Sequence, residues 1–375
     1  MKIGVDVRSL AASAGRGVSH YTASLLGELV AAHPEDTWQL LQTGRQAFAL
    51  PANLQQPNVE LTHVRYPNKL LNAGWSLQPW PQLERWLGGI DVFFAPNLGF
   101  VRLGRRTPLV TTVHDLSFVL FPQLYSRRER LWHRAVDPRR LLARSTAVIA
   151  VSGQTEQELT TLYKLPPGKV SVVHSGIDEI YRRPVSPAAI AAVRKKYKLP
   201  DSYVLFLGAL EPRKNLPTLL AAFRLAREAG LTSELVLAGQ AKRGELPAGQ
   251  TTGVHVLGYV DEADKPALYA AANSLVNVSL HEGFGFPPLE ALACGTPSVV
   301  SDLPVFAETL GAAAIRITPT DPARLAEKLV HLERDQALRA ALLGRGPDVL
   351  GPLTWRHAAA QTYAVLTAAS HDHAK

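Results

Sequence analysis

The stretch that decides the fold is His281–Asp302, HEGFGFPPLEALACGTPSVVSD, which predicts a glycine loop followed by a helix. It follows an apolar, strand-like run, Ser274–Leu280, and its two glycines let backbone N–H groups come close to a ligand. Two prolines suit the first turn of a helix, and Gly295 ends that helix. The amino end of such a helix, with its exposed N–H groups and its dipole, is typical of an anion site.

Two glutamates of this stretch have a spacing that can place both in one crevice. Glu282 lies in the glycine loop, and Glu290 lies about one turn into the helix. A carboxylate accepts two hydrogen bonds, which fits the adjacent hydroxyls of a ribose or a hexose. A βα corner with two solvated glutamates gives the same pattern, so the spacing alone leaves both interpretations open.

Apolar runs on either side of this stretch alternate with helical patterns, which predicts parallel sheets covered by helices on both faces. The predicted strands of the first half are Lys2–Val7, Trp38–Gln42, Val59–Val64, Asp91–Ala95, Pro108–Val113, Ala147–Val151 and Val170–Val173. Those of the second half are Tyr203–Leu207, Glu234–Ala238, Val254–Leu257, Ser274–Leu280, Ser298–Ser301 and Ala313–Ile317. Helical stretches are predicted at Val18–His33, Leu83–Leu87, Arg127–Ala143, Gln154–Tyr163 and Trp355–Ala369.

The alternation of strands and helices restarts after a polar linker, so we predict an α/β protein with two doubly wound, Rossmann-like domains. The first domain is placed at residues 1–181 and the second at residues 182–355. Sheets of this kind bind ligands at the carboxyl ends of their strands. Two domains facing each other would therefore hold a substrate in the cleft between them.

The composition is that of a globular enzyme, because 46% of the 375 residues are hydrophobic and 19% are charged. A single cysteine, Cys294, excludes a disulfide framework and favours a reducing compartment. No apolar run approaches the length of a membrane span, and the first residues read as a strand instead of a signal peptide. These features predict a cytoplasmic protein.

The net charge of +8 is concentrated in the first half of the chain. Residues 1–185 carry 21 Lys and Arg against 14 Asp and Glu, whereas residues 186–375 carry 19 against 18. Much of the excess lies between Arg127 and Arg144, a stretch that also contains Leu131 and Trp132. Such a helix can lie on an anionic membrane, although a solvated helix face has the same pattern. No nucleic-acid-binding motif accompanies the charge, which argues against nucleic acid as a partner.

The segment HEGFGFPPLEALACGTPSVVSDLPVFAE, with seven residues between Glu282 and Glu290, closely resembles the E-x7-E signature of retaining GT-B glycosyltransferases of family 4. This family is also described as glycosyltransferase group 1, and the resemblance extends over most of the chain. It implies a GT-B fold, hexosyl transfer from a nucleotide sugar and a first domain on the acceptor side. It also implies that the final helix, 356–375, packs back on that domain, and that transfer retains the anomeric configuration through an oxocarbenium-like state.

A second motif, GALEPRKN at Gly208–Asn215, resembles the family's G-x-x-E-P-x-K-N segment. It ends a strand and opens a helix, where two cations can neutralise a diphosphate. By the likeness, Arg213 and Lys214 contact the diphosphate and stabilise the charge that develops on it as the glycosidic bond breaks. Many relatives carry an Arg where this chain has Ala209, so fewer cations remain for that contact. A solvated pair of cations at a helix start is the alternative.

The segment Thr111–Phe118 resembles the H-D-L-S-F motif of the family, whose histidine faces the sugar. The resemblance makes His114 a catalytic candidate, as a donor to sugar hydroxyls near the reacting carbon. Asp115 is a candidate on the sugar or acceptor side, and capping of the next turn is its alternative role. Gly15-Arg16-Gly17 resembles the glycine loop near the diphosphate and the acceptor, and Arg16 could serve either.

The resemblance also implies a set of donor contacts. Glu282 would bind the donor hexose and Glu290 the ribose. Tyr259 and Val260 lie where relatives hold the base through the main chain. The remaining donor-binding candidates are Gly15, Gly17, Gly283, Phe284, Gly285, Phe286 and Leu289. In the first domain, Trp75, Trp80 and Trp86 could line an acceptor groove, touch lipid or pack in the core.

No Asp-x-Asp triad occurs, so we expect transfer without a metal or any other cofactor. The pairing of H-D-L-S-F with L-E-P-R-K-N resembles bacterial mannosyltransferases that use GDP-mannose, and UDP-glucose is the next candidate donor. The expected acceptor is a lipid-linked saccharide of polysaccharide biosynthesis or a soluble saccharide. A nucleotide-sugar epimerase and a non-catalytic sugar-binding protein are the rival functions.

Overall fold

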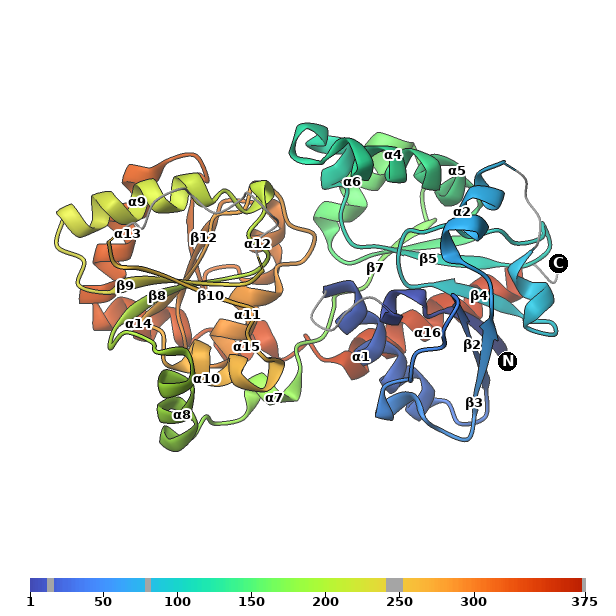
Figure 1. Cartoon of the computed structure of the whole chain (residues 1–375), viewed down its shortest axis with the longest axis horizontal. Helices are drawn as coiled ribbons and strands as arrows, with labels where there is room; N and C mark the ends of the chain where they lie inside the picture. Colours follow the sequence, from blue (N-terminus) through green and yellow to red (C-terminus); the bar gives the residue numbers. More distant parts are fainter. Residues whose placement is uncertain (12–16, 78–81, 241–251, 373–375) are drawn as a thin grey trace. The chain divides into compact units, whose positions relative to one another are not determined.

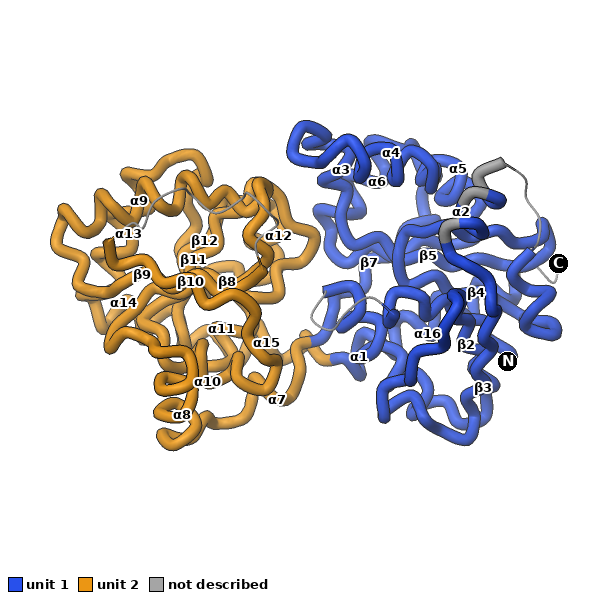
Figure 2. The backbone as a smooth tube through the Cα atoms, in the orientation of Figure 1, with its two compact units in different colours: residues 1–176, 355–375 blue, residues 177–354 orange. Residues whose placement is uncertain are grey.

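The chain forms two α/β units in the computed structural model, which describes residues 1–11, 17–77, 82–240 and 252–372. Unit 1 consists of Met1–Gly176 and Trp355–Lys375, and unit 2 of Ile177–Thr354 (Figure 2). Both boundaries lie slightly before the predicted ones. Residues 177–181 belong to unit 2 because the Ile177 N–H donates to the Leu353 carbonyl at 2.9 Å within that unit.

Unit 1 is built on a parallel sheet of seven strands among the described residues (Figure 1). The strands have the spatial order β3-β2-β1-β4-β5-β6-β7, so the order reverses between β1 and β4. Their bounds are β1 Lys2–Asp6, β2 Thr37–Thr43, β3 Val59–Val64, β4 Val92–Ala95, β5 Leu109–Val113, β6 Ala147–Ala150 and β7 Val170–Val172. Ligands of doubly wound sheets bind where the strand order reverses, which for this unit is the edge beyond β1 and β4.

The helices of unit 1 cover both faces of its sheet, with α1 and α16 on one face and α4, α5 and α6 on the other (Figure 1). Their bounds are α1 Gly17–Ala32, α2 Asn68–Leu77, α3 Ser117–Leu120, α4 Arg127–Val136, α5 Pro138–Arg144, α6 Gly153–Tyr163 and α16 Trp355–Asp372. The final helix, α16, lies along α1, and its Trp355 ring meets the Tyr21 ring edge-on at 5.7 Å. Farther along, the Tyr363 hydroxyl donates to Asp36 at 2.7 Å.

Unit 2 contains a second parallel sheet, of six strands in the order β10-β9-β8-β11-β12-β13. Their bounds are β8 Tyr203–Leu207, β9 Glu234–Ala238, β10 Val254–Gly258, β11 Ser274–Asn277, β12 Ser298–Ser301 and β13 Ile315–Ile317. Its helices are α7 Glu179–Arg182, α8 Pro187–Tyr197, α9 Leu216–Glu228, α10 Lys265–Ala270, α11 Phe286–Ala293, α12 Pro304–Thr309, α13 Pro322–Arg334, α14 Gln336–Leu343 and α15 Gly346–Leu350. The strand order reverses between β8 and β11, so the segments that follow these two strands share one ligand-binding edge.

Two predicted elements end more than one residue earlier than expected, and both have local causes. The predicted helix Arg127–Ala143 is two helices, because Asp137 adopts a left-handed conformation with φ of 52° and Pro138 then starts α5. The predicted strand Ser274–Leu280 ends at Asn277, whose side-chain oxygen accepts the Ser279 N–H at 3.2 Å. That hydrogen bond turns the chain away from the sheet.

The turn after β9 requires a glycine, because two backbone segments approach each other closely there. Gly239 has φ of 145°, and a Cβ built on it would lie 1.8 Å from the carbonyl oxygen of Gly208. The ends of β8 and β9 can therefore pack closely beneath the ligand-binding edge of unit 2.

Candidate active site

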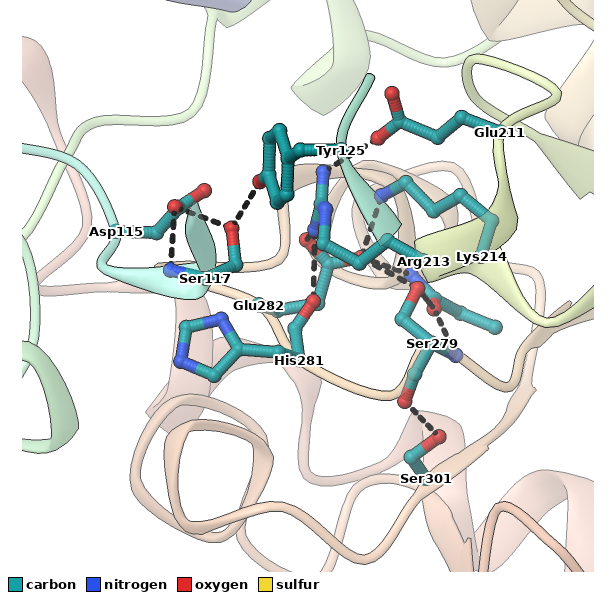
Figure 3. A network of polar contacts seen from close by, with 11 residues as sticks. Asp115, Ser117, Tyr125, Glu211, Arg213, Lys214, Ser279, His281, Glu282 and Ser301 are labelled. Atoms are coloured by element: carbon teal, nitrogen blue, oxygen red, sulfur yellow. Dashed lines mark hydrogen bonds and ion pairs between the residues drawn. The ribbon is translucent and has the colours of Figure 1, made fainter. Parts of the chain in front are cut away.

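The carboxylate of Glu282 lies among cations and polar groups at the edge beyond β8 and β11 (Figure 3). Its Oε1 accepts from Lys214 Nζ at 2.5 Å and from Ser279 Oγ at 2.7 Å. Its Oε2 lies 3.2 Å from Nη1 of Arg213. Lys214 and Arg213 come from the short 3-10 helix Pro212–Lys214, which follows β8. Strands that are distant in sequence but adjacent in the sheet therefore bring the two predicted motifs together.

The loop after β11 is held in place by its own side chains. Ser279 Oγ lies 2.6 Å from Asn277 Oδ1 as well as close to Glu282, and Ser301 of β12 donates to the Ser279 carbonyl at 2.7 Å. The Leu280 N–H donates to the Arg213 carbonyl at 2.9 Å. The position of Glu282 is thus fixed by three neighbouring strands before any ligand binds.

Glu282 is ionised in this environment. Its side chain is almost completely buried, which alone would raise the pKa, but the charges of Lys214 and Arg213 and the hydrogen bonds outweigh burial. The net result holds the pKa of Glu282 well below its usual range. A carboxylate in this state accepts hydrogen bonds and stabilises positive charge, but it does not donate a proton near neutral pH.

The two cations are balanced by two carboxylates. Arg213 donates to Glu211 at 2.8 Å through Nη2 and to the His281 carbonyl at 2.7 Å through Nη1, while Lys214 is paired with Glu282. An incoming diphosphate would therefore meet a cluster without net charge. It would have to draw Arg213 and Lys214 partly away from their present partners.

Glu290 has different partners from Glu282. It lies in α11, is almost fully buried and accepts a 2.6 Å hydrogen bond from the Tyr269 hydroxyl. Burial and the Glu290 charge together raise the pKa of Tyr269 well above its usual value, so this hydroxyl remains a donor. Tyr181 stacks edge-on against Tyr269 at 6.0 Å. Tyr269 thus holds the second glutamate of the signature, and Tyr181 packs against Tyr269.

The glycine loop between the two glutamates requires Gly285. This residue precedes α11 with φ of 88°, and a Cβ on it would lie 2.4 Å from the Phe306 ring. Phe284 and Leu289 are buried, and the Leu289 side chain has no exposed surface. Gly283, Phe284, Gly285 and Phe286 can offer backbone N–H groups at the start of the helix.

The base-side candidates differ in exposure. Val260 is buried, whereas 41% of the Tyr259 surface is exposed. Both follow β10, at the same edge of the sheet as the glutamate cluster.

His114 follows β5 in unit 1, and one of its ring nitrogens is already used. Nε2 lies 2.8 Å from the Pro96 carbonyl, which can only accept, so Nε2 carries the proton. Burial lowers the pKa of His114 and favours the neutral ring, whose Nδ1 is then an acceptor. The donor role expected for His114 would require the ring to be protonated at Nδ1 as well, because Nε2–H is already used by the Pro96 carbonyl.

Asp115 performs the capping role. Its Oδ1 accepts from the backbone N–H of Ser117 at 3.0 Å and from the Ser117 hydroxyl at 2.6 Å, and that hydroxyl also meets Tyr125 at 2.5 Å (Figure 3). These bonds form the turn that leads into α3, whose N-cap residue, Leu116, makes no side-chain capping hydrogen bond. A role on the acceptor side would have to use the other carboxylate oxygen.

Several candidates lie elsewhere. Gly15, Arg16 and Trp80 fall outside the described residues, and Gly17 is the first residue of α1. Trp75 is a core residue with 1% of its surface exposed. No sequence pattern singles out Tyr269, Asn277 or Ser301, because each acts on a glutamate or a loop that becomes its neighbour only in the folded sheet.

Among the described residues, one group of side chains has the spacing of a metal site: His33, Glu35 and Asp36. It lies at the end of α1, where Asp36 already accepts from the N-terminal amine and from Tyr363. None of the described helices has the length and apolar character of a membrane span.

The family model described as "Glycosyltransferase Family 4" matches residues 15–180, and the one described as "Glycosyl transferases group 1" matches residues 201–335. The chain is 30% identical over 285 residues to O-antigen chain mannosyltransferase B of Escherichia coli, an alignment that covers 72% of each protein.

Solved structures share the fold. Sucrose-phosphate synthase from Thermosynechococcus elongatus has a TM-score of 0.75 at 21% identity, covering 98% of this chain and 100% of its own. Anabaena Alr3699/HepE, solved in complex with UDP-glucose, has a TM-score of 0.71 at 21% identity, with coverages of 98% and 100%.

Two doubly wound parallel domains with this likeness define the architecture as that of a GT-B glycosyltransferase. The relative that aligns over 72% of both proteins and the two family models then settle the family: this chain belongs to the group 1, or family 4, glycosyltransferases and is a hexosyltransferase.

Proposed function

We propose that this protein transfers mannose from GDP-mannose to a saccharide or lipid-linked saccharide, with retention of configuration and without a metal. The observation that carries the proposal is the cluster of Glu282, Lys214 and Arg213 at the ligand-binding edge of unit 2. It combines cations for a diphosphate leaving group with a carboxylate that stays ionised.

The cations and the start of α11 would stabilise the leaving group. As the glycosidic bond breaks, negative charge grows on the diphosphate, and Lys214 and Arg213 can shift from the two glutamates toward it. Backbone N–H groups of residues 283–286 add a second set of donors at the helix start. This arrangement supplies the charge that a metal supplies in other transferases, which is why we propose metal-independent transfer.

The two glutamates would hold the donor at two places. In this proposal Glu282 accepts from hexose hydroxyls and faces the oxocarbenium-like carbon, where its low pKa keeps it negative. Glu290 accepts from the ribose hydroxyls, while the Tyr269 hydrogen bond fixes its orientation. Neither carboxylate is placed as a proton donor. With neither carboxylate placed as a nucleophile, the acceptor hydroxyl is proposed to attack on the face that the leaving diphosphate occupied and to pass its proton to the departing phosphate oxygen, which gives retention.

The choice of mannose and GDP rests on sequence likeness. The relative that aligns over 72% of both chains is a mannosyltransferase, and the H-D-L-S-F and L-E-P-R-K-N segments are of the mannosyltransferase type. UDP-glucose is the second candidate, because a protein of the same fold was solved with UDP-glucose at 21% identity.

We further propose that the protein works in the cytoplasm and touches the anionic inner face of the membrane through α4. This helix exposes four arginines, Arg127, Arg128, Arg130 and Arg134. Leu131 and Trp132 on the same helix have exposed fractions of 65% and 42%. Cations beside exposed apolar side chains are typical of helices that lie in a membrane interface, where a lipid-linked acceptor would be held.

Thermal unfolding with nucleotides tests the donor assignment. GDP and GDP-mannose at a hundred times Kd should raise the Tm by about 5–10 °C, with or without EDTA, and UDP compounds should not. Lys214→Ala should lose the shift, whereas Lys195→Ala, an exposed lysine on α8, should keep it. A shift with UDP compounds alone would overturn the donor, and a shift abolished by EDTA would overturn metal independence.

Product analysis separates transfer from the rival functions. With GDP-mannose and no acceptor, an epimerase would change the sugar of the donor, and a binding protein would leave donor intact even with acceptors present. We expect an α-linked product with a mannan-type acceptor, because GDP-mannose is an α-glycoside and transfer is proposed to retain configuration. A β-linked product would refute retention.

A further inference from the structure

The ring of His114 has an aromatic neighbour in the first α-helix of unit 1. His114 follows β5 at the carboxyl edge of the sheet, and Tyr21 lies in α1. The two ring centres are 4.6 Å apart and the ring planes meet at 86°, which is an edge-to-face contact. Tyr21 has only 1% of its surface exposed, whereas His114 is half-buried. A buried ring therefore supports a ring that a ligand can still reach.

The hydroxyl group of Tyr21 contributes little to this contact. Its oxygen lies 3.5 Å from Oγ1 of Thr112, which is at the upper limit of a hydrogen-bond distance. Burial raises the pKa of Tyr21 to about 12, so the hydroxyl stays neutral near pH 7. The aromatic ring is the part of Tyr21 that meets His114.

A third ring packs against Tyr21. Trp355 is the first residue of α16, and its ring centre lies 5.7 Å from that of Tyr21 with an interplanar angle of 68°. Trp355 is buried, and its ring also meets the His20 ring at 6.0 Å. The residue before it, Thr354, is the last residue of unit 2. The contacts from His114 through Tyr21 to Trp355 therefore join the end of β5 to the point where the chain returns to unit 1.

One hydrogen bond does not fix the orientation of the His114 ring. The bond from Nε2 to the Pro96 carbonyl holds one atom, but the ring can still tilt about the line through that atom and Cγ. Such a tilt moves Nδ1, which lies off this line. The perpendicular contact with Tyr21 opposes the tilt, because the two rings would lose their edge-to-face packing. Tyr21 therefore supplies the second constraint that sets the direction of Nδ1.

We propose that Tyr21 is a positioning residue for hexosyl transfer and that Trp355 holds Tyr21 in place. The effect of Tyr21 on the reaction passes through His114, whose Nδ1 would meet the sugar. The inference rests on the proposed function, because it takes transfer as the reaction in which His114 acts. It goes beyond that function by assigning a role at the sugar side to α1 and to the final helix.

Steady-state kinetics of the full chain with GDP-mannose and a mannan-type acceptor test the role of Tyr21. Tyr21→Leu keeps an apolar side chain but removes the ring, so kcat should fall about tenfold while KM for GDP-mannose stays within about twofold. Tyr21→Phe keeps the ring and should restore most of the lost rate. Phe93→Leu truncates another buried ring of unit 1 and is the control for a general loss of packing; its kcat should stay within about twofold of wild type.

A double-mutant cycle distinguishes positioning from a merely structural effect. If Tyr21 acts through His114, adding Tyr21→Leu to His114→Ala should lower kcat by no more than about twofold below His114→Ala alone. A second tenfold loss in that background would overturn the proposal, because Tyr21 would then act on another part of the site. Equal kcat values for wild type and Tyr21→Leu would overturn it as well.

NMR of the protein with nitrogen-labelled histidine reports the tautomer of His114 without turnover. Wild type should carry the proton on Nε2. In Tyr21→Leu this fraction should fall, because a ring without its second constraint leaves the Pro96 carbonyl more often. Trp355→Leu should have the same effect, and Trp355→Phe, which keeps a ring, should not. An unchanged fraction in Tyr21→Leu would refute the positioning role, and an unchanged fraction in Trp355→Leu would refute the role of Trp355.

The donor measurements keep this test separate from the proposed function. If GDP-mannose is not a substrate but the tautomer fraction changes as described, the donor assignment fails and the positioning of His114 stands. If GDP-mannose is a substrate and Tyr21→Leu changes neither kcat nor the tautomer fraction, the positioning fails and the donor assignment stands.

Discussion

Replacing Lys214 by methionine should destabilise the protein in a way that depends on pH. Lys214 donates to Glu282 at 2.5 Å, and both side chains are at most 10% exposed. Removing one partner of a buried pair costs about 3–5 kcal/mol when the other charge is left alone. Because Arg213 still lies 3.2 Å from Glu282, we expect the low end, about 3 kcal/mol at pH 7.

The sign of the pH effect follows from the depressed pKa of Glu282. In the native protein this group contributes stability above its unfolded pKa of about 4.3, and that stability is lost as the pH falls toward the folded value. Without Lys214 the folded pKa rises, so the variant loses less stability on acidification. The difference between wild type and Lys214→Met should therefore shrink as the pH falls below about 5, by roughly 0.6 kcal/mol at pH 4 if the variant's carboxyl titrates near its unfolded pKa, and by more at lower pH.

Urea unfolding of the full chain at pH 7 and pH 4 measures both quantities. With a slope of about 3 kcal/mol/M, the midpoint at pH 7 should fall by about 1 M. Lys195→Met is the matched control and should move the midpoint little. Adding Glu282→Gln to Lys214→Met should restore part of the loss, because the buried charge is gone. A loss under 1 kcal/mol, or one that is the same at both pH values, would refute the assignment of Glu282 as a buried carboxylate held by Lys214.

Three further predictions concern other contacts. Tyr269→Phe should lower the free energy of unfolding by about 1–3 kcal/mol, because buried Glu290 loses its hydrogen bond, and should weaken GDP-mannose binding. Urea unfolding would measure the first effect and a binding titration the second, and no change in either would contradict the positioning role of Tyr269. Since burial lowers the pKa of His114, transfer should stay constant from pH 8 down to 6.5 and fall only at lower pH; a fall centred at 6.5 that His114→Asn abolishes would contradict the neutral ring. Arg130→Glu should reduce sedimentation of the protein with anionic vesicles, because each arginine near an anionic membrane contributes about 1 kcal/mol of attraction. If the wild-type protein sediments equally with neutral and with anionic vesicles, the proposed membrane contact is wrong.

Most strands were predictable because their residues are apolar over a buried run; an exception is Val59–Val64, which contains Glu60, Thr62 and His63 and has no fully buried residue. Val59–Val64, Tyr203–Leu207, Glu234–Ala238 and Ser298–Ser301 have the predicted bounds. Errors arose where a side chain overrides the apolar pattern, as at Asn277, which ends β11 by accepting the Ser279 N–H.

The residues of the site were predictable, but the hydrogen bonds and ion pairs between them were not. Glu282 and Lys214 lie on different motifs, and nothing in their separate patterns says that they pair. Their contact depends on β8 and β11 being neighbours in the sheet, which is a property of the strand order. Likewise, the proton on His114 is set by the Pro96 carbonyl, a main-chain atom that no side-chain motif records.

The division of the chain has a consequence for biosynthesis. Unit 1 is discontinuous, because α16 is translated after all of unit 2, yet its Trp355 and Leu366 are buried within unit 1. On the ribosome, residues 1–176 must therefore wait, with an apolar face uncovered, while residues 177–354 emerge and can complete their own core. Chaperone demand should fall mainly on the first half of the nascent chain, and it should end when the last helix leaves the exit tunnel.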